Sequence, residues 1–387
     1  MDKTFFYIGN RKPGEGSGMA VCCFDAETGA LRNLGNELEP MKLCIGCTHI
    51  DGKRKILYCT DEVQDYPGLP GGGGGRLFAF AISPGNGGLK LIGSRPSYGA
   101  KPSYLTTDED SKYLLVTNHG GRTTATSTEK DAFGRYHLKV SHDESSVALF
   151  PLNGDGSIGE PVHIFRLEGS GPKFFQHSAH AHSIVKAPGK NLYAVCDKGG
   201  DQIYMFRIDY ENRKMVPCEG TPYLRSAGSA PRYAVFHPLR PYLYVNKESE
   251  TILSSFRYSD QGKLEQIETI STLPEGYDAP PRDALSQSDI CISGNGKILY
   301  DMLRIVNVIN VYEIDETSGK LMLIQTLNTP DGGRAFGLSP DGRFMAVAFH
   351  DSHRTDIYAV GADGKLQGVV SSAASSSPST VSFFGTS

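Results

Sequence analysis

Residues 334–346 read Arg334-Ala-Phe-Gly-Leu-Ser-Pro-Asp-Gly-Arg-Phe-Met-Ala346, two short hydrophobic runs joined by a Ser-Pro-Asp-Gly turn. A turn of this kind between two such runs is typical of a β-hairpin. The same phrase recurs along the chain, with further copies that begin at Thr48, Ser103, His182, Arg232 and Asp289. Internal repeats indicate a repeat architecture, so this phrase decides the fold.

The second run of each copy ends in an element of the Leu-Tyr type, which marks the spacing of the repeat. These anchor positions are Tyr7, Tyr58, Leu115, Tyr193, Tyr244, Tyr300 and Ala346. A third and a fourth run follow each anchor and are joined by turns such as Asp-Gly or Ser-Gly, which are hairpin signals. Seven units of four antiparallel strands predict an all-β fold, a seven-bladed β-propeller that forms a single domain over residues 1–387.

The two ends of the chain complete the count of strands. Residues Thr4 to Gly9 have the pattern of a second strand but no first strand before them, while Thr380-Val-Ser-Phe-Phe384 resembles a first strand with nothing after it. We therefore expect the C-terminal strand to join the N-terminal blade and close the ring, which removes exposed sheet edges. The widest gap between anchors holds a polar insertion in blade 3, residues 123–146.

Composition excludes several classes of protein. The 387 residues carry a net charge of −4 without a basic block, so no nucleic-acid partner is expected. A hydrophobic fraction of 39% excludes a disordered or collagen-like chain. No apolar stretch approaches the roughly 20 residues of a membrane span. The only CxxC is Cys44-Ile-Gly-Cys47, without a second pair for a zinc ribbon, so we expect a reduced, cytoplasmic protein.

The anchors also point to a functional end of the propeller. The first and second strands of a blade form an antiparallel hairpin, so the start of one and the end of the other lie together near the central axis. Four residues past the anchors, all seven positions hold an ionisable residue: Arg11, Glu62, His119, Asp197, Glu248, Arg304 and His350.

The starts of the first strands supply a second set of candidates. This position holds His182, Arg232, Ser288 and Arg334 in blades 4 to 7, with Asp289 next to Ser288 and His180 two residues before His182. An ordinary solvated mouth with ion pairs is one interpretation. Three arginines facing one point would repel each other, however, so a carboxylate- or phosphate-bearing ligand is the interpretation we favour.

A metal site is a further possibility, since His177, His180 and His182 lie close together in the sequence. No cysteine or carboxylate stands at matching spacing, and alternate residues of one strand rarely complete a metal site. We therefore predict neither a metal nor a cofactor.

The quoted repeats, together with Val245-Asn-Lys-Glu248 and His180-Ala-His182-Ser, resemble the lactonase family of seven-bladed propellers. That family includes the cycloisomerase-type 6-phosphogluconolactonases and the fungal carboxy-cis,cis-muconate cyclase. The resemblance implies an active site in the axial funnel, made by a histidine, two arginines and a glutamate at His182, Arg232, Glu248 and Arg304. Leu303 and Lys247 depart from the residues that are usual in the family.

This resemblance implies metal-free hydrolysis of a sugar-derived lactone in a monomer or small homo-oligomer. We expect Arg232 and Arg304 to stabilise the developing oxyanion, and Glu248 or His182 to activate water as general base. His180 and Arg334 would hold an anionic group of the substrate. Two alternatives remain open: a cycloisomerase or lyase that works by proton transfer, and a non-catalytic scaffold that binds protein partners.

Overall fold

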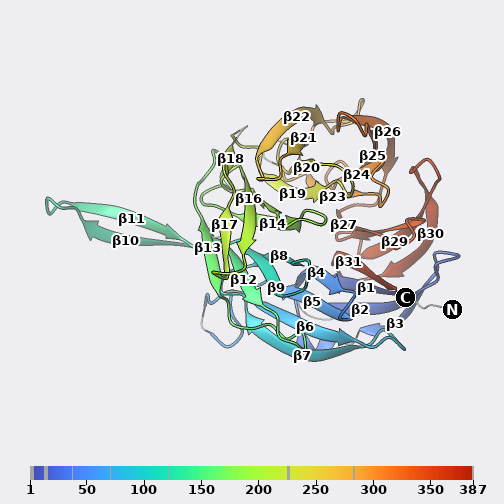
Figure 1. The fold of residues 1–387 in the computed structure, drawn as a ribbon, viewed down its shortest axis with the longest axis horizontal. Coiled ribbons are helices and arrows are strands. Elements are labelled where there is room, and N and C mark those ends of the chain that lie inside the picture. Colours follow the sequence, from blue (N-terminus) through green and yellow to red (C-terminus); the bar gives the residue numbers. More distant parts are fainter. Residues whose placement is uncertain are drawn as a thin grey trace.

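Seven antiparallel sheets stand around a central axis in the computed structural model, which describes residues 4–12, 16–36, 38–69, 71–121, 123–224, 227–281 and 284–385 (Figure 1). This confirms the predicted seven-bladed propeller. The innermost strand of each blade, here strand A, contacts strand A of the next blade all the way around the ring, and strands B, C and D follow outward.

The strands, given from A to D in each blade, have the following bounds. Blade 1 contains β31 (Pro378–Gly385), β1 (Thr4–Asn10), β2 (Gly18–Phe24) and β3 (Leu31–Asn36). Blade 2 contains β4 (Ile45–Asp51), β5 (Ile56–Asp61), β6 (Arg76–Ile82) and β7 (Leu89–Pro96). Blade 3 contains β8 (Pro102–Thr107), β9 (Tyr113–Asn118), β12 (Ser145–Pro151) and β13 (His163–Leu167). Blade 4 contains β14 (Ala181–Lys186), β15 (Tyr193–Asp197), β16 (Gln202–Asp209) and β17 (Lys214–Pro217), and β18 (Tyr223–Leu224) also pairs with β16.

Blade 5 contains β19 (Pro231–Phe236), β20 (Tyr242–Lys247), β21 (Ile252–Tyr258) and β22 (Leu264–Ser271). Blade 6 contains β23 (Gln287–Ile292), β24 (Ile298–Leu303), β25 (Val308–Ile314) and β26 (Leu321–Asn328). Blade 7 contains β27 (Gly333–Leu338), β28 (Phe344–Phe349), β29 (Arg354–Val360) and β30 (Leu366–Ala374). One short 3₁₀ helix, η1 (Glu39–Met41), precedes blade 2, and within the described ranges no helix is long and apolar enough to cross a membrane.

The C-terminal strand closes the ring, as predicted. Strand β31 pairs antiparallel with β1, with Phe5 opposite Phe384 and Tyr7 opposite Ser382. The two termini of the chain thus meet in one blade. Blade 1 is therefore completed by strands from both ends of the described chain.

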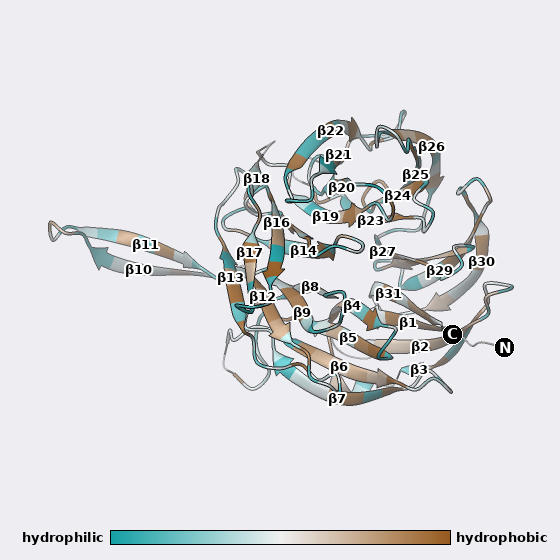
Figure 2. Ribbon diagram, in the orientation of Figure 1, coloured by the Kyte–Doolittle hydropathy of each residue, from teal (hydrophilic) through white to brown (hydrophobic). Residues whose placement is uncertain are grey.

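Buried tyrosines of the repeat join four of the blades to the blade that follows. The hydroxyl groups of Tyr7, Tyr58, Tyr244 and Tyr300 donate hydrogen bonds, 2.8 to 3.1 Å long, to the carbonyl oxygens of Gly87, Gly156, Gly319 and Gly364. Each of these glycines lies in the turn between strands C and D of the following blade. The Leu-Tyr element therefore recurs because its tyrosine links adjacent blades. The hydrophobic residues of the inner strands, brown in Figure 2, fill the space between the sheets.

The insertion in blade 3 forms a separate hairpin. Its strands β10 (Thr124–Lys130) and β11 (Tyr136–His142) pair antiparallel and project from the propeller into solvent (Figure 1). We call this hairpin, residues 124–142, the arm.

Candidate active site

One backbone hydrogen bond recurs at the same end of all seven blades. The residue after the end of strand B donates its N–H to the carbonyl oxygen of the residue just before strand A, for example Glu248 to Ala230 at 2.9 Å. This bond holds the ends of strands A and B together beside the axis. In every blade the donor is an ionisable residue: Arg11, Glu62, His119, Lys198, Glu248, Arg304 and His350.

The structure corrects the prediction in blade 4, where Lys198 and not Asp197 occupies this position. Lys198 N–H bonds to His180 O at 3.0 Å, as Glu248 N–H bonds to Ala230 O. In blade 4 the last residue of strand A, Lys186, pairs with the anchor Tyr193. In blade 5 the last residue of strand A, Phe236, pairs with Leu243, the residue before the anchor Tyr244. Tyr193 thus lies one residue earlier in its strand than the other anchor tyrosines, so counting four residues forward stops at Asp197.

Asp197 organises the backbone near the site. Its Oδ1 accepts hydrogen bonds from the N–H groups of His180 at 2.6 Å, Gly199 at 3.0 Å and Gly200 at 3.1 Å. Burial raises its pKa to about 6 even though these bonds favour the charged form. The side chain therefore shapes the turn that presents Lys198, rather than lying in the ring of ionisable residues.

Three cations converge on the buried carboxylate of Glu248. Lys198 Nζ lies 2.7 Å from Oε2, while Arg304 Nη2 and Arg232 Nε lie 2.5 Å and 3.1 Å from Oε1. The three cations come from blades 4, 5 and 6, so this cluster is built across two blade boundaries. Its formal charge is positive, because three cations meet one carboxylate.

The same contacts determine the protonation state of Glu248. Burial on its own would raise the pKa of the carboxyl group, but the charges of Lys198, Arg304 and Arg232 outweigh burial and lower this pKa to about 2. Burial lowers the pKa of Lys198, and Glu248 opposes that shift. Glu248 is thus fully ionised and weakly basic at neutral pH, which makes it a poor general base.

A β-bulge explains how strand A turns its side chains towards this cluster. The register of strands A and B shifts between Pro231 and Ala234 in blade 5, so two consecutive residues, Arg232 and Tyr233, both reach the site. Arg232 contacts Glu248, and its guanidinium lies 4.3 Å from the centre of the Tyr233 ring. The corresponding strands of the other six blades carry a register shift at the same place.

The tyrosine next to Arg232 was not among the predicted residues. The ring of Tyr233 makes edge contacts with His182, at 5.1 Å, and with Tyr104 of blade 3, at 5.5 Å. Alternation along a regular strand would have placed Tyr233 on the opposite face from Arg232, so only the bulge could have indicated it.

The histidines of blades 3 and 4 form a stacked group beside the cations. The His180 ring stacks on His119 at 4.5 Å, and its Nδ1 lies 2.9 Å from the His119 carbonyl oxygen. The His182 ring meets His119 edge-on at 5.8 Å. His177 contacts the edge of His180 at 4.9 Å. The rings thus stack on each other, and within the described ranges no group of three His, Cys, Asp or Glu residues is arranged to hold a metal ion.

His182 is a neutral base at physiological pH in this setting. Burial lowers its pKa well below 6.5, and the nearby charges of Arg232 and Lys198 lower it further. Its Nδ1 has no hydrogen-bond partner among the described residues. A neutral imidazole whose Nδ1 has no partner can accept a proton, although the cations that make Glu248 a weak base also lower the pKa of this imidazole.

Blades 1 and 2 add a second ion pair at the same end of the axis. Arg11 and Glu62 form a salt bridge between side chains that are 29% and 9% exposed. Burial raises the pKa of Glu62, although Arg11 opposes this shift. The charge of Arg232 also acts on Glu62, so this pair and the Glu248 cluster belong to one electrostatic site.

The remaining candidates are Asp289, Arg334 and His350. Asp289 accepts hydrogen bonds from the N–H groups of Ile290 and Phe336, both at 2.8 Å, and so ties blade 6 to blade 7. Arg334 occupies the bulge of blade 7 and is half-buried. His350 pairs with Asp351 at 2.8 Å, with a third of its side chain exposed.

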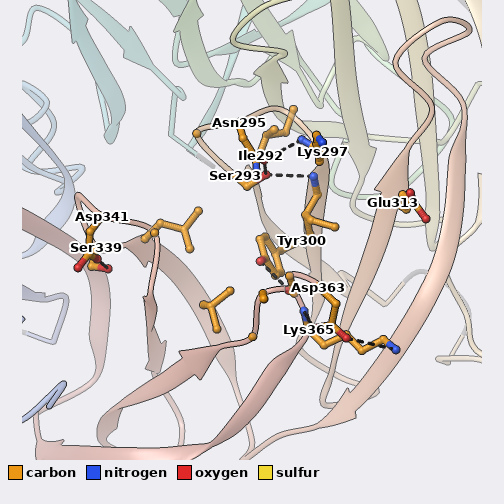
Figure 3. Close-up of a pocket in the computed structure, with 18 of the residues that line it drawn as sticks. Ile292, Ser293, Asn295, Lys297, Tyr300, Glu313, Ser339, Asp341, Asp363 and Lys365 are labelled. Atoms are coloured by element: carbon orange, nitrogen blue, oxygen red, sulfur yellow. Dashed lines mark hydrogen bonds and ion pairs between the residues drawn. The ribbon is translucent and has the colours of Figure 1, made fainter. Parts of the chain in front are cut away.

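A hollow of about 870 Å³ lies between blades 6 and 7 at the opposite end of the strands (Figure 3). It is lined by the turns between strands A and B, including Asn295 and Asp341, and by Asp363 and Lys365 of another turn. The described residues that line it include none of the candidates above. We therefore place the chemistry at the axial cluster.

Comparisons with known proteins agree with the propeller fold. A family model described as "Lactonase, 7-bladed beta-propeller" matches residues 5–383. The 6-phosphogluconolactonase of Bacillus subtilis is 24% identical over 358 residues, which cover 90% of this chain and 88% of that protein. The 6-phosphogluconolactonase of Formosa agariphila is 26% identical over 366 residues, 92% of each chain. The solved periplasmic gluconolactonase of Pseudomonas aeruginosa has the same fold, with a TM-score of 0.84 at 22% identity over 99% of each chain.

Proposed function

The chain belongs to the lactonase family of seven-bladed β-propellers, and from this premise we propose that it hydrolyses a sugar-derived lactone that carries a negative charge. The observation that carries the proposal is the excess of cations around Glu248, where Lys198, Arg232 and Arg304 surround one carboxylate. An anionic substrate would offset that excess. The names of the relatives suggest 6-phosphogluconolactone as the first compound to test.

In the proposed reaction, water attacks the carbonyl carbon of the lactone while neutral His182 removes a proton from that water. The developing oxyanion is stabilised by the guanidinium groups of Arg232 and Arg304. The ring C–O bond then breaks, the alkoxide oxygen takes up the proton, and a hydroxy acid leaves. The reaction balances with water alone, and the proposal invokes no cofactor.

In this scheme Glu248 does not act as the general base. Because its pKa is about 2, its carboxylate holds Lys198, Arg232 and Arg304 in place and keeps them at short range without strong mutual repulsion. We therefore propose Glu248 as a positioning residue and His182 as the general base. Arg334 and His180 would bind the phosphate or carboxylate group of the substrate. Arg334 lies in the bulge of blade 7.

Acid release from a panel of sugar lactones tests the proposal, with spontaneous hydrolysis subtracted. The panel includes 6-phosphogluconolactone and the uncharged gluconolactone. We expect turnover of the phosphorylated lactone with the higher kcat/KM, a large loss of kcat in His182→Gln, and no loss in His137→Gln, which alters an exposed histidine of the arm. A panel without any turnover would overturn the proposal and favour proton-transfer chemistry at the same site.

A further inference from the structure

The arm is the one part of the described chain that stands free of the propeller. Every residue of β10 and all but the last of β11 are exposed (Figure 1). A two-stranded hairpin on its own is only marginally stable in water, and both edges of this one are open. Its exposure therefore calls for a partner.

The arm has one apolar face and one polar face. The strand pairing places Tyr136, Leu138 and Val140 on one face, where they are 72%, 73% and 55% exposed. Their cross-strand partners on that face are Lys130 and two threonines. On the other face Glu129 pairs with Lys139 at 2.7 Å. Three large exposed side chains in one row are unusual for a surface in contact with water and are typical of an interaction site.

The tip and the base of the arm are complementary to each other. At the tip, Phe133 is 83% exposed and lies between Lys130 and Arg135, of which Arg135 pairs with Asp131. At the base, a hollow of about 320 Å³ is lined by Tyr98 and Ile164, which are 45% and 37% exposed, and by two carboxylates, Asp143 and Glu144.

After the ion pairs of the described residues are counted, one unpaired negative charge remains at the base of the arm and one unpaired positive charge remains at its tip. Arg166 pairs with Glu144 at the base at 2.6 Å, whereas no described cation pairs with Asp143 and no described carboxylate pairs with Lys130. The tip therefore combines the exposed Phe133 with one unpaired positive charge, and the hollow combines Tyr98 and Ile164 with one unpaired negative charge. Within one molecule they cannot meet, because the length of the arm separates them.

From these observations we propose that the arm binds a second copy of this chain. Two arms that pack antiparallel through their apolar faces, about a two-fold axis, place the tip of each arm at the base of the other. Phe133 of one copy then enters the hollow beside Tyr98 of its partner, and Lys130 approaches Asp143. Both contacts form twice, as a closed, symmetric dimer requires.

Sedimentation velocity of the full chain over a range of concentrations tests this proposal. We expect a monomer–dimer equilibrium that Leu138→Lys and Phe133→Asp each weaken by roughly tenfold or more, since each change removes an interface anchor. Ser127→Lys places the same charge on the polar face and serves as the matched control, with the dissociation constant of the wild type. At concentrations where the wild type is monomeric, the melting temperature of the variants should match that of the wild type, because the arm lies outside the propeller.

A disulfide trap supplies an independent measurement. When Phe133→Cys and Tyr98→Cys proteins are mixed and oxidised, we expect a cross-linked heterodimer, whereas Phe133→Cys alone should not cross-link because the two tips lie apart. A wild type that stays monomeric at every concentration would overturn the proposal. A dimer that Leu138→Lys leaves intact would do the same.

Discussion

Lys198 Nζ lies 2.7 Å from Glu248 Oε2 across the boundary between blades 4 and 5, in a contact where both side chains are almost fully buried. Two buried charges are expensive to remove from water unless they are well paired. This pair is further stabilised by Arg232 and Arg304 on the other oxygen of the carboxylate. Lys198 is thus part of the proposed catalytic cluster, although its neighbour Asp197 was the residue predicted.

Replacing each of these two neighbours should distinguish their roles. Lys198→Met removes one charge-assisted hydrogen bond and one cation from the site, so we expect kcat/KM for the anionic lactone to fall by roughly ten- to a hundredfold. Asp197→Asn keeps an oxygen that accepts the three backbone bonds, and its activity should remain near that of the wild type. Steady-state kinetics on both variants decides the matter; equal losses in the two would contradict the assignment.

The pH profile of hydrolysis should report on His182. Its pKa lies well below 6.5 because burial and nearby cations disfavour the imidazolium, so the base remains neutral as the pH falls through that value. We expect kcat/KM, corrected for spontaneous hydrolysis, to stay level from neutral pH to below 6.5 and to decline only at lower pH. An acid limb centred at or above 6.5 would exclude His182 as the base.

The sequence predicted the blade number because the anchor tyrosines of four of the seven units have the same task. Tyr7 and Tyr300 donate to turn glycines of the following blade in the same way. A contact repeated around a ring leaves a repeated pattern in the sequence. Blade 4 departs from the pattern, since Tyr193 lies one position earlier, and this shift alone hid Lys198.

Other parts of the site depended on geometry that no strand pattern contains. Arg232 and Tyr233 both reach the site because of a bulge, whereas alternation would send one of them away. The composition of residues 123–146 predicts only a polar insertion. Its alternating Tyr136-His-Leu-Lys-Val140 segment did carry the signal of a strand with one apolar face.

Neutralising Glu248 should destabilise the fold as well as impair catalysis. Glu248→Gln leaves Lys198, Arg232 and Arg304 buried without their carboxylate, which we expect to cost about 3–5 kcal/mol in the free energy of unfolding. Glu62→Gln is the matched control at the same position of blade 2. The pKa of Glu62 is raised because burial outweighs Arg11, so this change should cost much less. Chemical denaturation of both variants measures the difference, and equal costs would argue against a special role for the Glu248 cluster.

The same cluster predicts how stability depends on pH. The pKa of Glu248 is about 2 in the folded protein, compared with an ordinary value of 4.5. A lowered pKa stabilises the fold fully above pH 4.5, and this contribution is lost as the pH falls from 4.5 towards 2. Wild-type protein should therefore lose more stability than Glu248→Gln over this interval. Measuring the free energy of unfolding of both proteins at a series of pH values between 4.5 and 2 tests this difference.

Two turn glycines of blade 7 allow a direct test of the contacts between blades. Gly364 and Gly342 both have a left-handed backbone, with φ of +78° and +72°. A Cβ atom on Gly364 would come within 2.4 Å of Ile298 in blade 6, whereas a Cβ on Gly342 would meet nothing within 4 Å. Alanine at either position carries the conformational cost of a left-handed residue, about 1–2 kcal/mol.

Gly364→Ala adds a clash with a buried side chain and also disturbs the carbonyl that accepts the Tyr300 hydroxyl, so it should cost roughly 1–3 kcal/mol more than Gly342→Ala. Thermal unfolding of the two variants measures this excess directly. If they unfold alike, the contact of Gly364 with blade 6 does not contribute to stability as the structure implies.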